Sequence, residues 1–153
     1  TSKMYPIKQM KEVISTLSKT YSVLLFGGGA HEIKIIEAIS CQYPGVKSVA
    51  GIYTMQEELT LMSHLKVMLA MDSGNAHMAA MMGVNVITLW GVTHPYAGFA
   101  PFNQPLENCL LSDHYKYPKI PTSIYGKRYP KGYENAMASI SVEEILSAVK
   151  KAI

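Results

Sequence analysis

The stretch KVMLAMDSGNAHMAAMMGVNVITLWG, Lys66 to Gly91, decides the fold. It begins with an uninterrupted apolar run over Val67 to Met71, as expected for a strand with both faces buried in a parallel sheet. Asp72, Ser73 and Gly74 follow, and these residue types cap helices and permit tight turns. The apolar run therefore ends in a polar turn.

A helix and a second strand complete this unit. Ala and Met, both good helix formers, dominate Asn75 to Met82, and Gly83 stands where a left-handed C-terminal cap would fall. Val86 to Leu89 is then predicted to be a second buried strand. The polar turn lies where a strand's carboxyl end meets a helix's amino end, which is where ligands bind in open α/β sheets.

The composition indicates one well-packed domain. The chain has 153 residues, of which 48% are hydrophobic and 16% charged, enough for a single core. A net charge of only +3 argues against a nucleic-acid partner. No apolar stretch reaches the length of a transmembrane segment and the first residues form no signal peptide, so we expect a cytoplasmic protein. Cys41 and Cys109 have no metal-ligand spacing, and we expect both to be buried thiols.

The rest of the chain alternates helices with strands. Apolar periodicity and capping residues predict helices over Ile7 to Lys19, Ala30 to Gln42, Met55 to His64 and Ser141 to Ile153, and strands over Ser22 to Phe26, Val46 to Gly51 and Asn108 to Leu111. Such alternation predicts an α/β fold with a mostly parallel sheet and right-handed crossovers.

Three further features have competing interpretations. The turn Gly27 to Gly29 between a strand and a helix can admit a phosphate, but it is neither a GxGxxG motif nor a P-loop and serves equally as a tight turn. Thr54 and Glu57 fit a capping box, which we favour over a catalytic role for the carboxylate. Residues 112–135 interleave tyrosines with basic residues and prolines, a pattern that suits an ordered surface loop, a polyanionic acceptor or single-stranded nucleic acid.

The central turn offers the residues for binding an anion. Ser73, Gly74 and their neighbours present backbone N–H groups at a helix amino end, which attract a group such as a diphosphate. His77 lies about one helical turn further on and can donate to a phosphate or a sugar hydroxyl. The alternative interpretation, which the sequence supports equally well, is that Asp72 caps the helix and that His77 is a buried histidine with a structural partner. There is no convincing metal set and no GxSxG nucleophile.

The order of these motifs resembles the bacterial ADP-heptose:lipopolysaccharide heptosyltransferases, glycosyltransferase family 9. There the sequence runs D-[ST]-G-x-x-H, strand, G-x-T-x-P, as it does here from Asp72 to His77 and from Gly91 to Pro95. Lys3 to Pro6 is similar to the family's K-x-[WY]-P, and Leu25 to Glu32 to its strand followed by a glycine turn and an acidic residue. The resemblance implies a three-layer Rossmann-like domain over residues 1–153, the C-terminal, donor-binding half of a two-domain GT-B enzyme.

The resemblance also implies a set of donor-binding residues. They are Lys3, Glu32, Met55, Asp72, Ser73, Gly74 and His77. Of these, Glu32 is implied to bind a ribose hydroxyl, Met55 to lie against the nucleotide and Asp72 to bind the heptose hydroxyls. The other residues of the set are implied to hold the diphosphate.

The implied reaction is an inverting transfer of heptose from ADP-heptose to the lipopolysaccharide core, without a metal or a cofactor. The catalytic base and the acceptor site are expected in an N-terminal domain outside this chain. This domain alone is therefore expected to bind the donor weakly or not at all, and to be inactive. The location implied is the cytoplasm, including the inner face of the inner membrane. The family also places a strand just before the K-x-[WY]-P turn, at the centre of the sheet, and no such strand precedes Lys3 in this sequence.

Two alternatives stay open at this stage. One is a non-catalytic module that binds a nucleotide or a sugar phosphate, and the other is a different GT-B-like enzyme such as a sugar-nucleotide epimerase. The identities of the sugar and the acceptor, and the oligomeric state, do not follow from the sequence.

Overall fold

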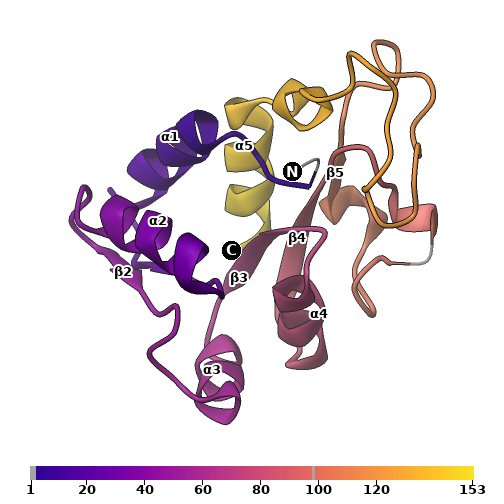
Figure 1. Cartoon of the computed structure of the whole chain (residues 1–153). Helices are drawn as coiled ribbons and strands as arrows, with labels where there is room; N and C mark the ends of the chain where they lie inside the picture. The colour runs from indigo at the N-terminus through magenta and orange to yellow at the C-terminus, as the bar shows by residue number, and fades with distance from the viewer. Residues whose placement is uncertain (1–2, 98) are drawn as a thin grey trace.

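The computed structural model describes residues 3–97 and 99–153, which form an α/β fold (Figure 1). The helices are α1 (Ile7–Leu17), α2 (Ala30–Ser40), α3 (Met55–Met62), α4 (Gly74–Met81) and α5 (Val142–Ala152). The strands are β1 (Val23–Leu25), β2 (Val46–Ser48), β3 (Val67–Met71), β4 (Asn85–Trp90) and β5 (Cys109–Leu111). Each predicted helix and strand is present, with ends that differ by a few residues, and the predicted fold class is confirmed.

All strand pairs are parallel, but the sheet is divided into two pieces. β1 pairs with β2, and β3, β4 and β5 form a separate sheet in that order. Among the described residues β1 and β3 do not pair with each other, so each has a free edge. The division lies at the centre of the sheet, where the resemblance implies a further strand.

Helices cover both faces of the larger sheet, which gives three layers. On one face, α1 and α5 lie side by side and pack on alternate residues of the strands (Figure 1). The buried members of this core include Val13, Ile87, Leu89, Ile140 and Ile145. On the other face, α3 and α4 pack on the remaining strand residues, and the buried members include Met62, Ala70, Ala76, Ala79 and Val86. The polar turns at the strand ends lie outside these two cores.

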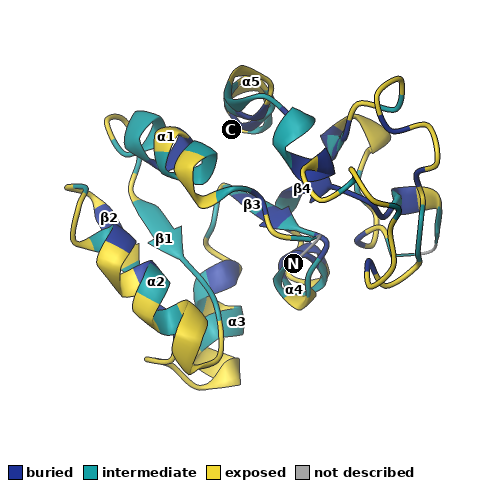
Figure 2. Cartoon of the chain, turned by 45° about the horizontal axis from the view of Figure 1, so that its top comes forward, coloured by how far each residue is buried: buried dark blue, intermediate teal, exposed yellow. Residues whose placement is uncertain are grey.

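Burial differs between the two sheets. β4 is buried from Val86 to Trp90, whereas all of β1 is half-buried, as Figure 2 shows in dark blue and teal. β3 alternates between half-buried and buried residues, so the prediction of equal burial on both faces is only partly correct. The reason is the free edge of β3, along which no neighbouring strand excludes solvent.

The N-terminal turn is anchored to the C-terminal half of the chain by Tyr5. Its side chain is 2% exposed, and its hydroxyl donates to the carbonyl of Ile140 at 2.8 Å. Burial, reinforced by the Glu12 carboxylate, raises the pKa of Tyr5 to about 12. The backbone N–H of Tyr5 also lies 3.3 Å from Met71 Sδ, at the end of β3. These contacts bring Lys3 to the carboxyl end of β3.

The expectations for the two cysteines and for membrane-spanning segments can be compared with the structure. Cys41 is exposed, which corrects the prediction of a buried thiol, because it follows α2 at the surface rather than facing the core. Cys109 is half-buried. No helix in the described part of the chain is long and apolar enough to cross a membrane.

Candidate functional site

The centre of the candidate site is an ion pair between two residues far apart in sequence. Lys3 Nζ lies 2.6 Å from Asp72 Oδ2, and the Asp72 side chain is only 4% exposed against 31% for Lys3. The contact is electrostatic, since no donor among the described residues is aligned for a hydrogen bond to that oxygen. A buried carboxylate is costly without a counter-charge, so Lys3 stabilises Asp72 in this place. The turn that contains Lys3 and the turn that contains Asp72, two separate motifs of the sequence, therefore meet at one point.

The amino end of α4 begins directly beside this pair. Ser73, not Asp72, occupies the cap position, with extended backbone angles (φ −147°, ψ 164°), which corrects the interpretation of Asp72 as the cap. The Ser73 side chain makes no capping hydrogen bond. A Cβ added at Gly74 would meet nothing within 4 Å, so the space next to the helix end is open. The end therefore has a hydroxyl without a partner among the described residues, N–H groups that Ser73 leaves uncapped and room for an anion.

The glycine turn after β1, unlike the amino end of α4, is already occupied by a side chain of the protein. The Gly28 N–H donates to the Glu32 carboxylate at 3.0 Å, so a negative charge already occupies this turn. A Cβ on Gly27 would lie 2.4 Å from the side chain of Ile36, so this glycine allows α2 to approach the strand closely. Of the two interpretations of the turn, tight packing is supported, and a phosphate here would be repelled by Glu32. The exposed carboxylate can instead accept from hydroxyl groups.

Met55 and Glu57 lie at the amino end of α3. Met55 is the first residue of the helix and is 59% exposed, so its thioether chain is free to contact a ligand. Glu57 is in the predicted capping box with Thr54, and the structural interpretation of this carboxylate is confirmed. Hydrogen bonds from the backbone N–H and the hydroxyl of Thr54 lower the pKa of Glu57. Its role is to complete the helix rather than to catalyse.

The structure thus places the predicted residues in two groups. The first contains Lys3, Asp72, Ser73 and Gly74, together with the half-buried His77 in the first turns of α4. The second consists of Glu32 and Met55, at the amino ends of α2 and α3. Within the described residues no three His, Cys, Asp or Glu side chains gather in a way that could hold a metal ion.

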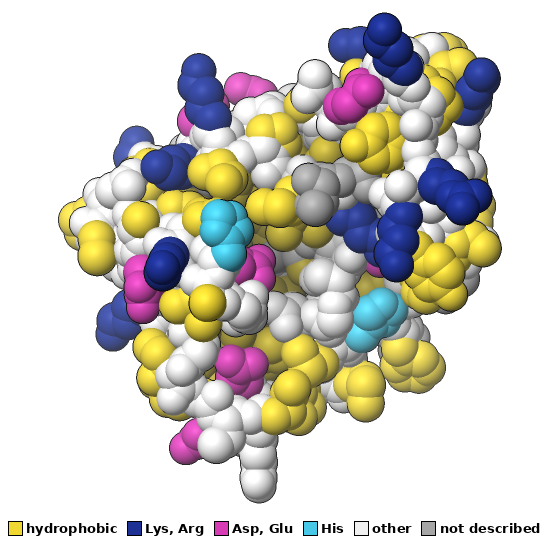
Figure 3. All heavy atoms as spheres, in the orientation of Figure 1, with side chains coloured by type: hydrophobic (Ala, Val, Ile, Leu, Met, Phe, Trp, Pro, Cys, Tyr) yellow, Lys and Arg dark blue, Asp and Glu magenta, His cyan; other side chains and the backbone are white. Residues whose placement is uncertain are grey.

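Residues 112–135 form an ordered loop rather than a tail. Thr122 donates its N–H to the carbonyl of Val92 at 3.0 Å, and the rings of Tyr117 and Tyr133 meet edge to face, with their centroids 5.1 Å apart. In Figure 3, Lys and Arg side chains gather at the upper right, over the loop that Figure 1 draws in orange. Of the interpretations left open by the sequence, an ordered surface loop is therefore supported.

Comparison with known proteins assigns the fold and the motifs to one family. The family model described as "Glycosyltransferase family 9 (heptosyltransferase)" matches residues 1–128. The chain belongs to glycosyltransferase family 9. This match includes the Lys3 turn, the central strand-turn-helix unit and most of the Tyr- and Lys-rich loop. The predicted family resemblance is confirmed.

Two known proteins are similar to this chain over most of its length. It is 26% identical over 137 residues to "Lipopolysaccharide heptosyltransferase 3" of Escherichia coli, covering 88% of this chain and 38% of that protein. The crystal structure of a family 9 glycosyl transferase from Veillonella parvula DSM 2008 matches with a TM-score of 0.75 at 18% identity, over 99% of this chain and 42% of the other. The chain therefore spans less than half the length of these two proteins.

Proposed function

We propose that this chain is the donor-binding half of a glycosyltransferase that uses an ADP-activated heptose, with the lipopolysaccharide core as acceptor. The observation that carries the proposal is the Lys3–Asp72 pair beside the open amino end of α4. One cation, one buried carboxylate and free helix N–H groups suit a ligand that joins a diphosphate to a polyhydroxylated sugar.

The roles of the residues follow from their chemistry. Lys3, 31% exposed, can turn its ammonium toward a diphosphate without leaving the Asp72 carboxylate. Ser73 and the first N–H groups of α4 would donate to phosphate oxygens, with His77 one turn away. Asp72 would accept from sugar hydroxyls. Glu32 would accept from the ribose, and Met55 would lie against the nucleotide.

In the proposed reaction, an acceptor hydroxyl attacks the anomeric carbon, the bond from that carbon to the phosphate oxygen breaks and ADP leaves. The negative charge that develops on the diphosphate is stabilised by Lys3 and the amino end of α4. The base that takes the hydroxyl proton would be supplied by an N-terminal domain, so this chain alone would bind donor without turnover. The protein would act in the cytoplasm or at the inner face of the inner membrane.

An ADP titration followed through backbone amide signals tests the proposal. We expect saturable shifts at residues 73–77 and near Glu32 and Met55, with Lys3→Ala weakening the affinity. Lys8→Ala, a change at an exposed lysine on α1, is the matched control and should leave the titration unchanged. Absence of a response at residues 73–77 with millimolar ADP would contradict donor binding. A stronger response to UDP than to ADP would favour the alternative of a uridine-sugar enzyme.

A further inference from the structure

The loop of residues 112–135 carries the net positive charge of the chain. It contains five of the fourteen basic residues and two of the eleven acidic ones, so the net charge of +3 falls on this segment and the rest of the chain has equal numbers of both signs. All five cations are exposed: Lys116, Lys119, Lys127, Arg128 and Lys131. None of them forms an ion pair within the residues that the structure describes, where the single pair joins Lys3 and Asp72. The loop is therefore a cationic surface that no carboxylate contact neutralises.

Within this loop, residues 122–128 form a turn that is closed by its own hydrogen bonds. The Thr122 hydroxyl donates to the carbonyl of Arg128 at 2.9 Å, and the Lys127 N–H donates to the Ser123 hydroxyl at 3.2 Å. The N–H of Thr122 also ties the turn to the segment that follows β4. The side chains at its tip are thus presented from an ordered backbone, so a partner does not have to order that backbone on binding.

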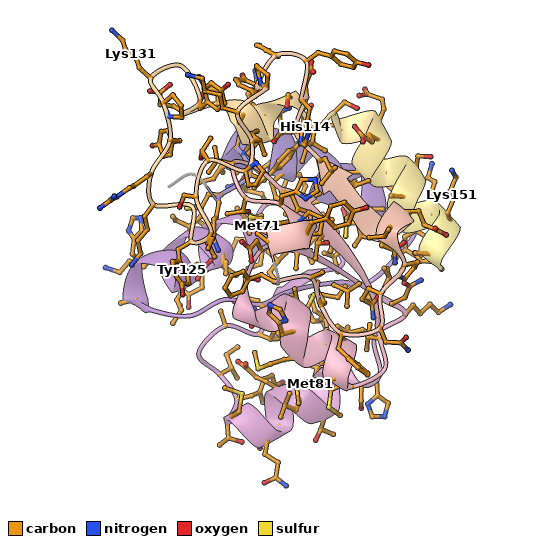
Figure 4. The ribbon with its side chains drawn as sticks, turned by 90° about the vertical axis from the view of Figure 1, so that its right-hand side faces the viewer. Met71, Met81, His114, Tyr125, Lys131 and Lys151 are labelled. Atoms are coloured by element: carbon orange, nitrogen blue, oxygen red, sulfur yellow. The ribbon has the colours of Figure 1, made fainter. Side chains whose placement is uncertain are left out.

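The tip of this turn exposes apolar and aromatic surface. Ile124 is 53% exposed and Tyr125 is 65% exposed. The Tyr125 ring contacts that of Phe99, with the centroids 5.7 Å apart, so a neighbour holds the ring while most of its surface faces solvent. In Figure 4, Tyr125 and Lys131 lie on one side of the molecule, whereas Lys151 of α5 lies on the other. Apolar side chains at this tip gain free energy when they leave water.

An apolar tip flanked by cations fits the surface of an anionic lipid bilayer. Tyrosine is favoured at the boundary between membrane and water, because its ring is apolar and its hydroxyl is polar. Lys and Arg place their apolar stems along the boundary and their charged ends on lipid phosphates, and each such cation strengthens binding to an anionic bilayer. Single-stranded nucleic acid requires aromatic faces on which bases stack, and Ile124 at the tip has no ring. The observations therefore favour a lipid surface over a nucleic acid.

We propose that residues 122–131, the basic turn, dock on an anionic lipid surface. The two apolar residues at the tip enter the boundary region, and Lys127, Arg128 and Lys131 contact the lipid phosphates. The basic turn follows β5, whereas Asp72 follows β3, and β4 lies between these two strands. The lipid contact is therefore separate from the proposed donor site. It adds a membrane-facing surface to the proposed function and does not rest on donor binding.

Cosedimentation of the chain with lipid vesicles tests this inference. Vesicles of equal parts phosphatidylcholine and phosphatidylglycerol should bind the chain saturably, and vesicles of phosphatidylcholine alone should bind it at least about tenfold more weakly. Salt at about 1 M should weaken binding to the anionic vesicles by at least about tenfold, because exposed charges are then screened. Absence of binding to the anionic vesicles, or equal binding to both kinds of vesicle, would overturn the inference.

Two charge variants locate the contact. Lys127→Gln/Arg128→Gln should weaken binding to the anionic vesicles by roughly twentyfold, since each cation near the surface contributes about fivefold. Lys8→Gln/Lys34→Gln is the matched control, because it removes the same charge from exposed lysines of α1 and α2 and should leave binding unchanged. All four side chains are exposed, and unchanged amide signals elsewhere would verify the fold of each variant. Equal losses in the two variants would contradict a docking surface at the basic turn.

A second pair of variants tests whether the tip enters the boundary region. Ile124→Ser/Tyr125→Ser keeps every charge and should weaken binding by about tenfold through the lost apolar contact. Ile52→Ser/Tyr53→Ser is the matched control, since the same two residue types are 63% and 46% exposed between β2 and α3. This control should bind the vesicles as the unaltered chain does. Unchanged binding of the tip variant would overturn the proposed insertion.

Two further titrations separate this inference from its alternatives. A single-stranded oligonucleotide that binds the chain more tightly than the anionic vesicles do would overturn the lipid assignment in favour of nucleic acid. The ADP titration has its own readout at residues 73–77. A chain that binds vesicles but not ADP would contradict the donor proposal alone, and a chain that binds ADP but not vesicles would contradict the lipid contact alone.

Discussion

The amino ends of α3 and α4 both follow a hydroxyl residue in the cap position, Thr54 and Ser73, but their chemistry is opposite. At α3, Thr54 Oγ1 accepts the Glu57 N–H at 3.3 Å, and the Glu57 carboxylate accepts the Thr54 N–H at 2.8 Å. At α4, Ser73 is in the equivalent cap position but makes no capping bond, and the space at Gly74 is open. A helix end whose donors are capped by its own chain is structural, whereas an end that its cap residue leaves free is available to a ligand.

The two ends also differ in their charged partners. Glu57 supplies a carboxylate to α3 from within the helix, which favours the helix dipole and repels an incoming anion. α4 has no acidic residue in its first turn, and the ammonium of Lys3 lies close by on Asp72. The comparison therefore supports the proposed anion binding at α4 and argues against it at α3, and the four predictions that follow test this difference.

The largest effect is expected from Lys3→Met. Without the ammonium the Asp72 carboxylate stays buried with no counter-charge, and because Lys3 itself is 31% exposed we expect a loss of about 1–2 kcal/mol of unfolding free energy rather than the larger cost of a fully buried pair. Urea unfolding measures the loss. Lys3→Met/Asp72→Leu should recover part of it, and Lys8→Met is the control. An unchanged midpoint for Lys3→Met would mean that the pair does not stabilise the site.

Thr54→Ala should cost about 1 kcal/mol, the usual value of an N-cap hydroxyl. Ser141→Ala provides a matched comparison, since Ser141 Oγ accepts the Glu144 N–H at the start of α5 at 3.1 Å. Thermal or urea unfolding of both variants checks this prediction. ADP binding at residues 73–77 should be unaffected by either change. A Thr54 variant as stable as the unaltered chain would contradict the role of the capping box.

Ser73→Ala should weaken ADP binding and leave stability nearly unchanged, the opposite of Thr54→Ala. Because its hydroxyl makes no capping bond, we expect less than about 0.5 kcal/mol of lost stability. The affinity for ADP should fall by roughly three- to tenfold, the value of one hydrogen bond. Calorimetric titration and urea unfolding of the same sample separate the two effects. A stability loss equal to that of Thr54→Ala would show that Ser73 is a structural cap.

The smallest effect is the pH dependence of α3. Hydrogen bonds from Thr54 hold the pKa of Glu57 below its ordinary 4.5, so the folded state binds fewer protons there than the unfolded state. The stabilisation is present above that ordinary value and is lost as pH falls through the lower folded pKa. The urea midpoint of the unaltered chain should therefore fall more steeply below pH 4.5 than that of Glu57→Gln. Parallel slopes for the two proteins would contradict this.

Much of this arrangement follows from local sequence. The apolar runs, the residues before each helix and the capping box of Thr54 and Glu57 predict the elements correctly, because each depends on neighbours within a few positions. The meeting of Lys3 and Asp72 was implied only by family resemblance, since it depends on Tyr5 reaching Ile140 across the length of the chain. The spacing of apolar residues along the chain does not predict a contact between residues so far apart in sequence.

Other features depend on what surrounds a residue in space. The exposure of Cys41 and the half-burial of β1 follow from which elements pack next to them, and the sequence alone predicted a more buried chain. The His94–His114 contact joins loops from two strands, and its signal in the sequence is only that each histidine closely follows a buried strand. The division of the sheet between β1 and β3 likewise appears only once strand pairing is known.

The most direct test of the central claim is a titration with inorganic pyrophosphate, which has the diphosphate without nucleotide or sugar. Amide signals from Ser73 to His77 should shift and saturate together with the Lys3 side chain, while those from Thr54 to Glu57 stay in place. Shifts of equal size at both helix ends, or at α3 alone, would contradict the assignment of the diphosphate to α4.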